Sequence, residues 1–229
     1  MIRIFDNSLE LARGAAEHFV ALAQKDFFTV ALSGGSTPKI LYQLLADEPF
    51  RAQVPWSRTH FFWSDERHVP PDHPDSNYRM THEAMLSRVP QTNVHRIHGE
   101  NPSAQKAADD YEHTLVQQTN QSLPRFDLIL LGLGTDGHTA SIFPESEVVH
   151  ETQRLVTAPW VEKLNSYRIT MTLPLLNNGA SVLFLVSGAD KAKIVKEVLE
   201  GPTKYPAQLV QPTSGELLWM LDKDAASQI

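Results

Sequence analysis

The sequence predicts an α/β fold built on a mostly parallel β-sheet, and three observations support this class. Short apolar runs of strand length alternate with longer segments of helical period, which is the order of βαβ units. The run at residues 27–32 is apolar almost throughout, as expected for a strand covered on both faces. The 15 prolines are scattered along the chain, so residues 1–229 are predicted to form one domain with helices flanking the sheet.

The first half of the chain is predicted to contain four strands, at residues 2–5, 27–32, 59–64 and 94–98. Asn7, with Glu10 three residues later, is predicted to form an N-cap and capping box for the helix that follows the first strand. Further helices are predicted at 39–46, at 77–88 and from Asn101-Pro102 to about residue 120. Proline is tolerated in a first helical turn, where its missing N–H would have no partner.

The second half is predicted to contain five strands, at residues 126–131, 154–158, 167–173, 180–186 and 217–221. One long helix is predicted at 189–200, because Gly201-Pro202 directly after it is a typical helix stop. The predicted architecture is therefore a single-domain Rossmann-like fold.

Composition excludes several functional classes. Lys and Arg number 20 against 27 Asp and Glu, a net charge of −7, so nucleic acid and acidic membranes are not expected partners. The absence of cysteine excludes disulfides, thiolate catalysis and cysteine-ligated metals, and fits a reducing cytoplasm. Acidic residues at positions 6, 10 and 17 argue against a secretory signal, and the apolar windows are too short to span a membrane.

Ligands of open α/β sheets bind beyond the carboxyl ends of the strands, and the loop after residue 32 has a suitable composition. Gly34 and Gly35 allow backbone N–H groups to approach a ligand, and Ser36 and Thr37 add hydroxyl groups. The positive end of the next helix faces this loop. The loop is interpreted as a phosphate cradle, although it lacks the Walker pattern GxxxxGK[ST] and an ordinary capped turn could have the same composition.

A second loop, at residues 63–77, begins with Asp65-Glu66-Arg67 directly after a predicted strand. An arginine at the sheet edge could hold a phosphate or a developing oxyanion. The alternative is a solvated charged loop, but long loops rich in proline are uncommon in compact domains unless they are functional.

The third loop, at residues 131–144, contains GxGxxG. A dinucleotide site is rejected because roughly four strands precede the motif and Pro144 limits any helix after it. Asp136 and His138 are more informative, because a histidine oriented by a carboxylate can act as a general base. The zinc motif HExxH and the nucleophile motif GxSxG are absent, so no metal and no cofactor are expected.

These loops resemble those of the 6-phosphogluconolactonase family, within the wider group that includes glucosamine-6-phosphate isomerases. The matching stretches are LSGGSTP at 32–38, DERHVPPDHPDSN at 65–77, GLGTDGHTASIFP at 132–144, YRITMTLPLLN at 167–177, SGADKA at 187–192 and PAQLVQPTSGELLWMLD at 206–222. Together they cover nearly the whole chain.

The resemblance implies hydrolysis of 6-phospho-D-glucono-1,5-lactone to 6-phosphogluconate in the oxidative pentose phosphate pathway, without a cofactor. It makes His138 the base that activates water, with Asp136 supporting it and Arg67 at the substrate or the oxyanion. It assigns the phosphate to Gly34, Gly35, Ser36, Thr37, Arg168 and Lys191. The sequence carries no signal for an oligomeric partner.

Two alternatives remain. Glucosamine-6-phosphate isomerases have a glutamate shortly after Asp-Gly-His, and this chain has Phe143 at that position, which disfavours a reaction with more acid–base steps. A noncatalytic sugar-phosphate sensor would carry a DNA-binding segment, and no basic helix-turn-helix precedes the first predicted strand.

Overall fold

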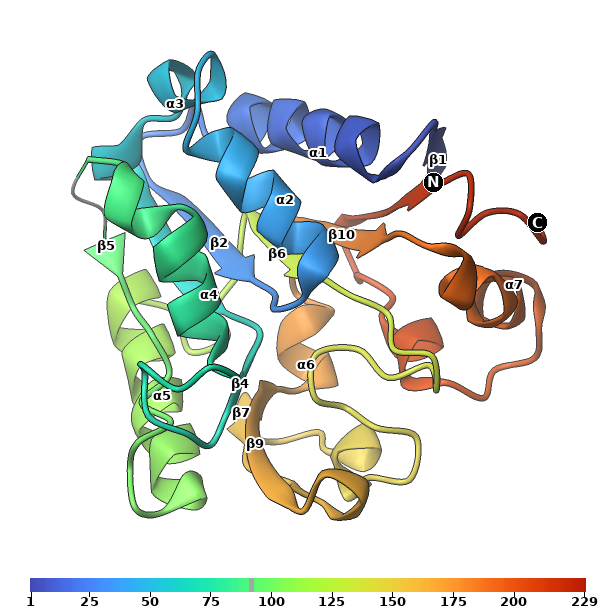
Figure 1. Ribbon diagram of the computed structural model, residues 1–229. Helices are drawn as coiled ribbons and strands as arrows, with labels where there is room; N and C mark the ends of the chain where they lie inside the picture. Colours follow the sequence, from blue (N-terminus) through green and yellow to red (C-terminus); the bar gives the residue numbers. More distant parts are fainter. Residues whose placement is uncertain (91–92) are drawn as a thin grey trace.

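The computed structural model describes residues 1–90 and 93–229 (Figure 1). Within these residues a seven-stranded sheet has the order β1-β11-β10-β6-β2-β3-β5. All neighbouring strands in it run parallel, which confirms the predicted fold class. The strands are β1 (Ile2–Phe5), β2 (Phe28–Leu32), β3 (Thr59–Trp63), β5 (Asn93–Val94), β6 (Leu128–Leu131), β10 (Ser181–Val186) and β11 (Glu216–Asp222).

Strands β2 and β6 lie side by side near the centre of this sheet. After β2 the chain adds β3 and β5 on one side, and from β6 onward it adds β10 and β11 on the other. The strand order therefore reverses between β2 and β6, which is where open parallel sheets bind their ligands. The loops that follow these two strands, at residues 33–35 and 132–138, are the glycine-rich loops predicted to carry chemistry.

Helices pack around the large sheet, with α1, α2 and α4 side by side in Figure 1. On α1, Leu11, Ala15 and Phe19 recur every four residues and are buried, which gives the helix its core-facing stripe. The α-helices are α1 (Ser8–Leu22), α2 (Ser36–Leu45), α3 (Phe50–Gln53), α4 (Asn77–Ala84), α5 (Ala104–Thr119), α6 (Leu173–Leu176) and α7 (Ala192–Glu200). The 3₁₀ turns are η1 (Trp56–Arg58), η2 (Leu86–Arg88), η3 (Glu147–His150), η4 (Glu162–Leu164), η5 (Ala189–Lys191) and η6 (Pro206–Leu209).

A second, small sheet is antiparallel and centred on β9 (Ser166–Met171). Its other strands are β4 (Asp65–Arg67), β7 (Val156–Thr157) and β8 (Trp160–Val161), each paired with β9. The prediction that 65–67 belong to a loop is wrong, because pairing with β9 draws these residues into a strand.

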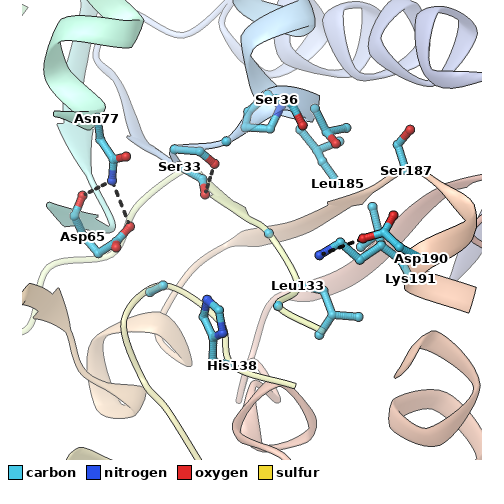
Figure 2. A pocket seen from close by; sticks show the side chains of 18 of the residues that line it. Ser33, Ser36, Asp65, Asn77, Leu133, His138, Leu185, Ser187, Asp190 and Lys191 are labelled. Atoms are coloured by element: carbon cyan, nitrogen blue, oxygen red, sulfur yellow. Dashed lines mark hydrogen bonds and ion pairs between the residues drawn. The ribbon is translucent and has the colours of Figure 1, made fainter. Parts of the chain in front are cut away.

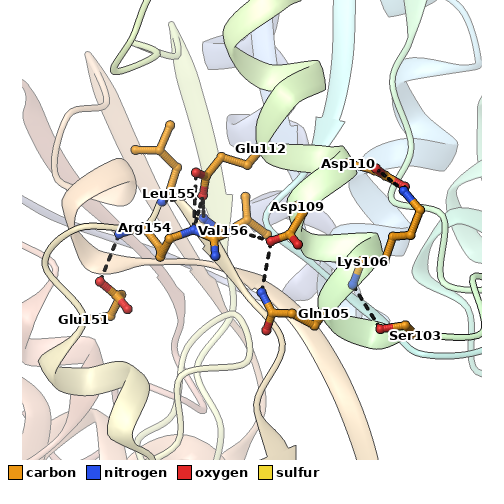
Figure 3. A network of polar contacts seen from close by, with 10 residues as sticks. All are labelled: Ser103, Gln105, Lys106, Asp109, Asp110, Glu112, Glu151, Arg154, Leu155 and Val156. Carbon is orange, nitrogen blue, oxygen red and sulfur yellow. Dashed lines mark hydrogen bonds and ion pairs between the residues drawn. The ribbon is translucent and has the colours of Figure 1, made fainter.

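Helix α5 packs on this small sheet, and a polar network fixes the contact (Figure 3). The carboxylate of Glu112 accepts hydrogen bonds from the backbone N–H groups of Leu155 (2.8 Å) and Val156 (3.0 Å). The same carboxylate pairs with Arg154 at 3.2 Å, and Arg154 also pairs with Asp109 at 2.6 Å. The network therefore ties α5 to the segment that leads into β7.

Several predicted boundaries shift for local reasons. The helix expected to open at Pro102 begins at Ala104, because the Ser103 hydroxyl accepts the Lys106 N–H at 3.2 Å and caps it. The strand expected at 167–173 ends at Met171, and Pro174 then stands in the first turn of α6.

Other boundaries shorten the predicted elements. The strand expected at 94–98 is reduced to Val94, which pairs within β5. The strand expected at 154–158 is reduced to the two residues of β7, Val156 and Thr157. The helices expected at 77–88 and 189–200 each include a 3₁₀ turn, η2 and η5.

None of the helices in residues 1–90 and 93–229 combines the length and apolar character needed to cross a bilayer.

Candidate active site

A cavity of about 380 Å³ opens at the reversal point between β2 and β6 (Figure 2). The loops after β2, β6 and β10 all contribute to its wall, which explains why residues far apart in the sequence meet there. It is lined by Ser33, Gly34, Gly35, Ser36, Thr37, Pro38, Asp65, Arg67, Asn77, Gly132, Leu133, Gly134, His138, Ala140, Leu185, Val186, Ser187, Asp190 and Lys191.

The predicted phosphate cradle forms one wall of the cavity. Helix α2 begins at Ser36, so Ser36 and Thr37 belong to its first turn and not to the loop expected before residue 39. The first N–H groups of a helix have no partner within it and favour an anion. Gly35 has φ +112°, a backbone conformation that glycine adopts without strain.

Tyr42 on α2 fixes the backbone of the loop that forms the cradle. The Tyr42 hydroxyl accepts the N–H of Ser33 (3.0 Å) and donates to its carbonyl oxygen (2.7 Å). Tyr42 is fully buried and its pKa is raised by that burial, so it stays a neutral hydrogen-bonding group. The loop geometry is therefore fixed before any ligand binds.

Lys191 reaches the same cavity from η5, and Figure 2 shows its ammonium group directed inward. The loop before η5 is anchored by Asp222 at the end of β11. This carboxylate accepts hydrogen bonds from Ser187 Oγ (2.5 Å) and from the N–H of Gly188 (3.0 Å). Sequence reasoning did not assign Asp222 a role, because its partners lie about 35 residues away in the sequence.

Asp136 and His138 form a direct pair. Asp136 Oδ1 lies 2.5 Å from His138 Nδ1 and also accepts the backbone N–H of His138 at 3.2 Å. A carboxylate acceptor at Nδ1 favours the tautomer with its proton on that nitrogen, so Nε2 carries the free lone pair. Gly134 leaves the space that the ring occupies, because a Cβ there would lie 2.0 Å from His138 Nδ1.

The second oxygen of the Asp136 carboxylate pairs with the ammonium of Lys163 in η4. Burial of Asp136 acts to raise its pKa, but the hydrogen bonds from Lys163 and His138 outweigh burial and hold that pKa well below its ordinary value. Asp136 is therefore a carboxylate at neutral pH. Lys163 was missed by sequence reasoning, because a lysine in a surface turn has no distinguishing pattern.

Arg67 and Arg168 lie opposite each other in the register of β4 and β9. Burial and the nearby Arg67 charge lower the pKa of Arg168. The Arg67 guanidinium donates to the carbonyl oxygen of Asp75. Two guanidinium groups side by side repel each other and create a strong local demand for an anion.

Arg168 lines an adjoining cavity of about 330 Å³, which shares Asp65, Arg67, His138 and Ala140 with the first. The residues expected to hold the phosphate therefore divide between two cavities: the cradle and Lys191 line the first, and Arg168 lines the second. Arg67 and His138 stand where the two cavities join.

Asp65 is a further buried group between the two cavities, with 7% of its surface exposed. It accepts hydrogen bonds from Ser141 Oγ (2.6 Å) and Asn77 Nδ2 (3.3 Å). Asn77 and Ser141 were not singled out in the sequence, although both stand in stretches that carry the family resemblance.

Glu66, the residue after Asp65, stabilises the start of α4 and lines neither of these two cavities. Its carboxylate accepts the N–H groups of Asn77 (2.7 Å) and Tyr78 (2.8 Å) and so holds the start of α4. Burial raises the pKa of Glu66, and these backbone donors offset part of that effect.

Among residues 1–90 and 93–229, no group of three or more His, Asp or Glu side chains has the arrangement of a metal site.

Residues 7–219 match the family described as glucosamine-6-phosphate isomerases/6-phosphogluconolactonase. A 6-phosphogluconolactonase of Synechocystis sp. is 43% identical over 217 residues, covering 91% of this chain and 88% of that protein. The crystal structure of 6-phosphogluconolactonase from Thermotoga maritima has a TM-score of 0.82 at 34% identity, covering 97% of this chain and 99% of that one. A monomeric glucosamine-6-phosphate deaminase, with a TM-score of 0.86 at 19% identity over 100% of this chain and 99% of that one, shares the fold. The chain belongs to the family of glucosamine-6-phosphate isomerases and 6-phosphogluconolactonases.

Proposed function

We propose that the protein hydrolyses 6-phospho-D-glucono-1,5-lactone to 6-phosphogluconate, the lactone-opening step of the oxidative pentose phosphate pathway. The observation that carries the proposal is the arrangement of one cavity, which His138, paired with Asp136, lines together with the Gly34–Thr37 cradle and Lys191. A cradle for an anion beside a base with a free nitrogen suits a phosphorylated substrate that reacts with water.

The reaction begins with water at the lactone carbonyl. His138 Nε2 takes a proton from the water as its oxygen bonds to the carbonyl carbon, and Asp136 stabilises the resulting imidazolium. Arg67 stabilises the negative charge on the carbonyl oxygen. The ring C–O bond then breaks, and the imidazolium returns its proton to the leaving ring oxygen, which gives the hydroxy acid and regenerates the base.

The cradle supplies orientation for this step. The substrate phosphate binds the first-turn N–H groups of α2, the hydroxyls of Ser36 and Thr37 and the ammonium of Lys191. Arg168, beside Arg67 in the adjoining cavity, adds positive charge at the junction. A strained lactone needs one base, one cation at its carbonyl and correct positioning, so neither a metal nor a cofactor enters this proposal.

Phe143 favours the lactonase over the isomerase reaction within this family. Its ring centre lies 4.3 Å from that of His138, so an apolar group packs against the base at the position that matches the isomerase glutamate. The isomerase must open an aminosugar ring and move a proton between carbons, which needs further acid–base groups.

A coupled assay tests the proposal directly. The lactone is generated from glucose 6-phosphate by its dehydrogenase, and its disappearance is followed with and without the protein. We expect hydrolysis well above the spontaneous rate and no ammonia release from glucosamine 6-phosphate. Lactone decay at the spontaneous rate would refute the proposal, and ammonia release would favour the isomerase.

We also propose that residues 1–229 act as a single domain, because the cavity joins segments from Ser33 to Lys191. The absence of cysteine supports a cytoplasmic location.

A further inference from the structure

Lys163 contacts both groups that surround the His138 ring. Its ammonium pairs with the second oxygen of Asp136 and lies 4.5 Å from the ring centre of Phe143. Phe143 in turn packs on His138, with ring centres 4.3 Å apart. A lysine 25 residues beyond His138 in the sequence thus contacts the pair from the adjoining cavity, which the cradle does not line.

We propose that Lys163 is a positioning residue that holds the Asp136 carboxylate in its orientation toward His138 and balances the carboxylate charge beside the imidazole. The effect on turnover rests on the proposed lactonase function, whereas the effect on His138 itself does not.

Geometry gives the first reason. Asp136 Oδ1 already accepts two hydrogen bonds from His138, one from the ring and one from the backbone. The Asp136 side chain remains 32% exposed, so without a partner its other oxygen would be hydrated and the carboxylate could rotate. A cation fixed on that oxygen stops the rotation.

Charge gives the second reason. A carboxylate beside an imidazole stabilises the protonated ring, which cannot act as a base. A lysine bound to that carboxylate opposes this effect, because its positive charge offsets the negative charge that the ring faces. The other charged groups that line cavities with the pair are Asp65 and Arg67 from β4, Arg168 from β9, Asp190 and Lys191 from η5, Glu145 from the loop after Phe143 and Glu162 from η4.

Two substitutions at Lys163 separate the charge from the packing. Lys163→Met removes the ammonium and keeps an unbranched stem over Phe143, whereas Lys163→Arg keeps the charge. Lys25→Met is the matched control: Lys25 pairs with Asp127 at 2.5 Å and is 51% exposed, against 53% for Lys163. Both lysines are exposed enough for the variants to fold, which circular dichroism verifies.

Two readouts are needed. The first is the titration midpoint of the His138 imidazole by NMR, with its signal identified by its loss in His138→Gln. The second is kcat and KM for the phosphorylated lactone between pH 5.5 and 7.5, with spontaneous hydrolysis subtracted.

In Lys163→Met we expect the midpoint to rise by about 0.5 to 1 pH unit. We expect kcat at pH 6 to fall about two- to tenfold while KM stays within twofold. In Lys163→Arg the midpoint and kcat should both stay close to their wild-type values, because the positive charge is kept. Lys25→Met should change neither quantity.

An unmoved or lowered midpoint overturns the proposal. A raised KM with unchanged kcat also overturns it, because Lys163 would then be a substrate-binding cation. If the wild-type protein has no lactonase activity, the midpoint alone decides: a rise in Lys163→Met supports the positioning role even though the proposed function has failed.

Discussion

The two halves of the candidate active site consist of different chemical groups. The cradle consists of main-chain N–H groups at the start of α2, placed by the parallel sheet and locked by Tyr42. The half proposed to carry the chemistry consists of side chains, with the Asp136–His138 pair on a loop of the large sheet and Arg67 and Arg168 on the small one. The main-chain part of the cradle tolerates the exchange of a side chain, so sensitivity in this half is expected at the Lys191 ammonium, whereas the proposed chemistry depends on each side chain.

His138→Ala should have the largest effect, because it removes the proposed base and leaves the cradle. We expect kcat for the phosphorylated lactone to fall about 10²- to 10⁴-fold, with KM within a few fold, in the coupled assay. His113→Ala, an exposed histidine on α5, serves as the control. Near wild-type kcat in His138→Ala would show that another group is the base.

Lys191→Ala should affect the phosphate-binding half of the site. If Lys191 binds the phosphate equally in the ground and transition states, KM rises about 10- to 100-fold and kcat changes little. Lys193→Ala, whose side chain on α7 is 82% exposed, should leave both constants unchanged. A fall in kcat without a rise in KM would place Lys191 in the chemical half.

Glu112→Ala tests whether the contact between α5 and β7 contributes to stability without contributing to substrate binding. It leaves the N–H groups of Leu155 and Val156 without their acceptor, which should cost about 1 to 3 kcal/mol of unfolding free energy in urea. KM should stay within twofold, because the network ties α5 to β7 and does not line the cavities. A large rise in KM at unchanged stability would contradict this division.

The smallest effect is a pH dependence of stability. Because the pKa of Asp136 is held below its ordinary 3.8 despite burial, its ionisation stabilises the folded state above pH 3.8, and this contribution is lost as the pH falls below that value. With Lys163 half exposed, we expect about 1 kcal/mol. The difference in urea stability between the wild type and Asp136→Asn should shrink between pH 5 and pH 2, and a constant difference would contradict the ion pair.

The large sheet and the small sheet also differ in how far the sequence predicts them. Strands β2, β6 and β10 were predicted because each is a nearly continuous apolar run, and the structure buries each along its whole length. Strand β4 was missed, because three charged residues show no strand period and are ordered by pairing with β9. The local sequence pattern thus identifies strands whose own residues are apolar, but not strands that form only by pairing with a segment distant in the sequence.

The same distinction applies to the site residues. Asp136 and His138 were recognised because they stand two residues apart in a glycine-rich loop, and the structure joins them directly. Lys163 and Asp222 were missed, because each acts on a loop that is remote in the sequence. Arg168 was recognised through the family resemblance, and the register of β9 places it opposite Arg67.

The comparison that tests the central claim most directly is between two substrates of the unmodified protein, 6-phospho-D-glucono-1,5-lactone and the same lactone without its phosphate. If the cradle and the Asp136–His138 pair act together on one molecule, kcat/KM should be at least about 10²-fold higher for the phosphorylated lactone. Equal values for the two lactones, or hydrolysis of neither above the spontaneous rate, would contradict the account.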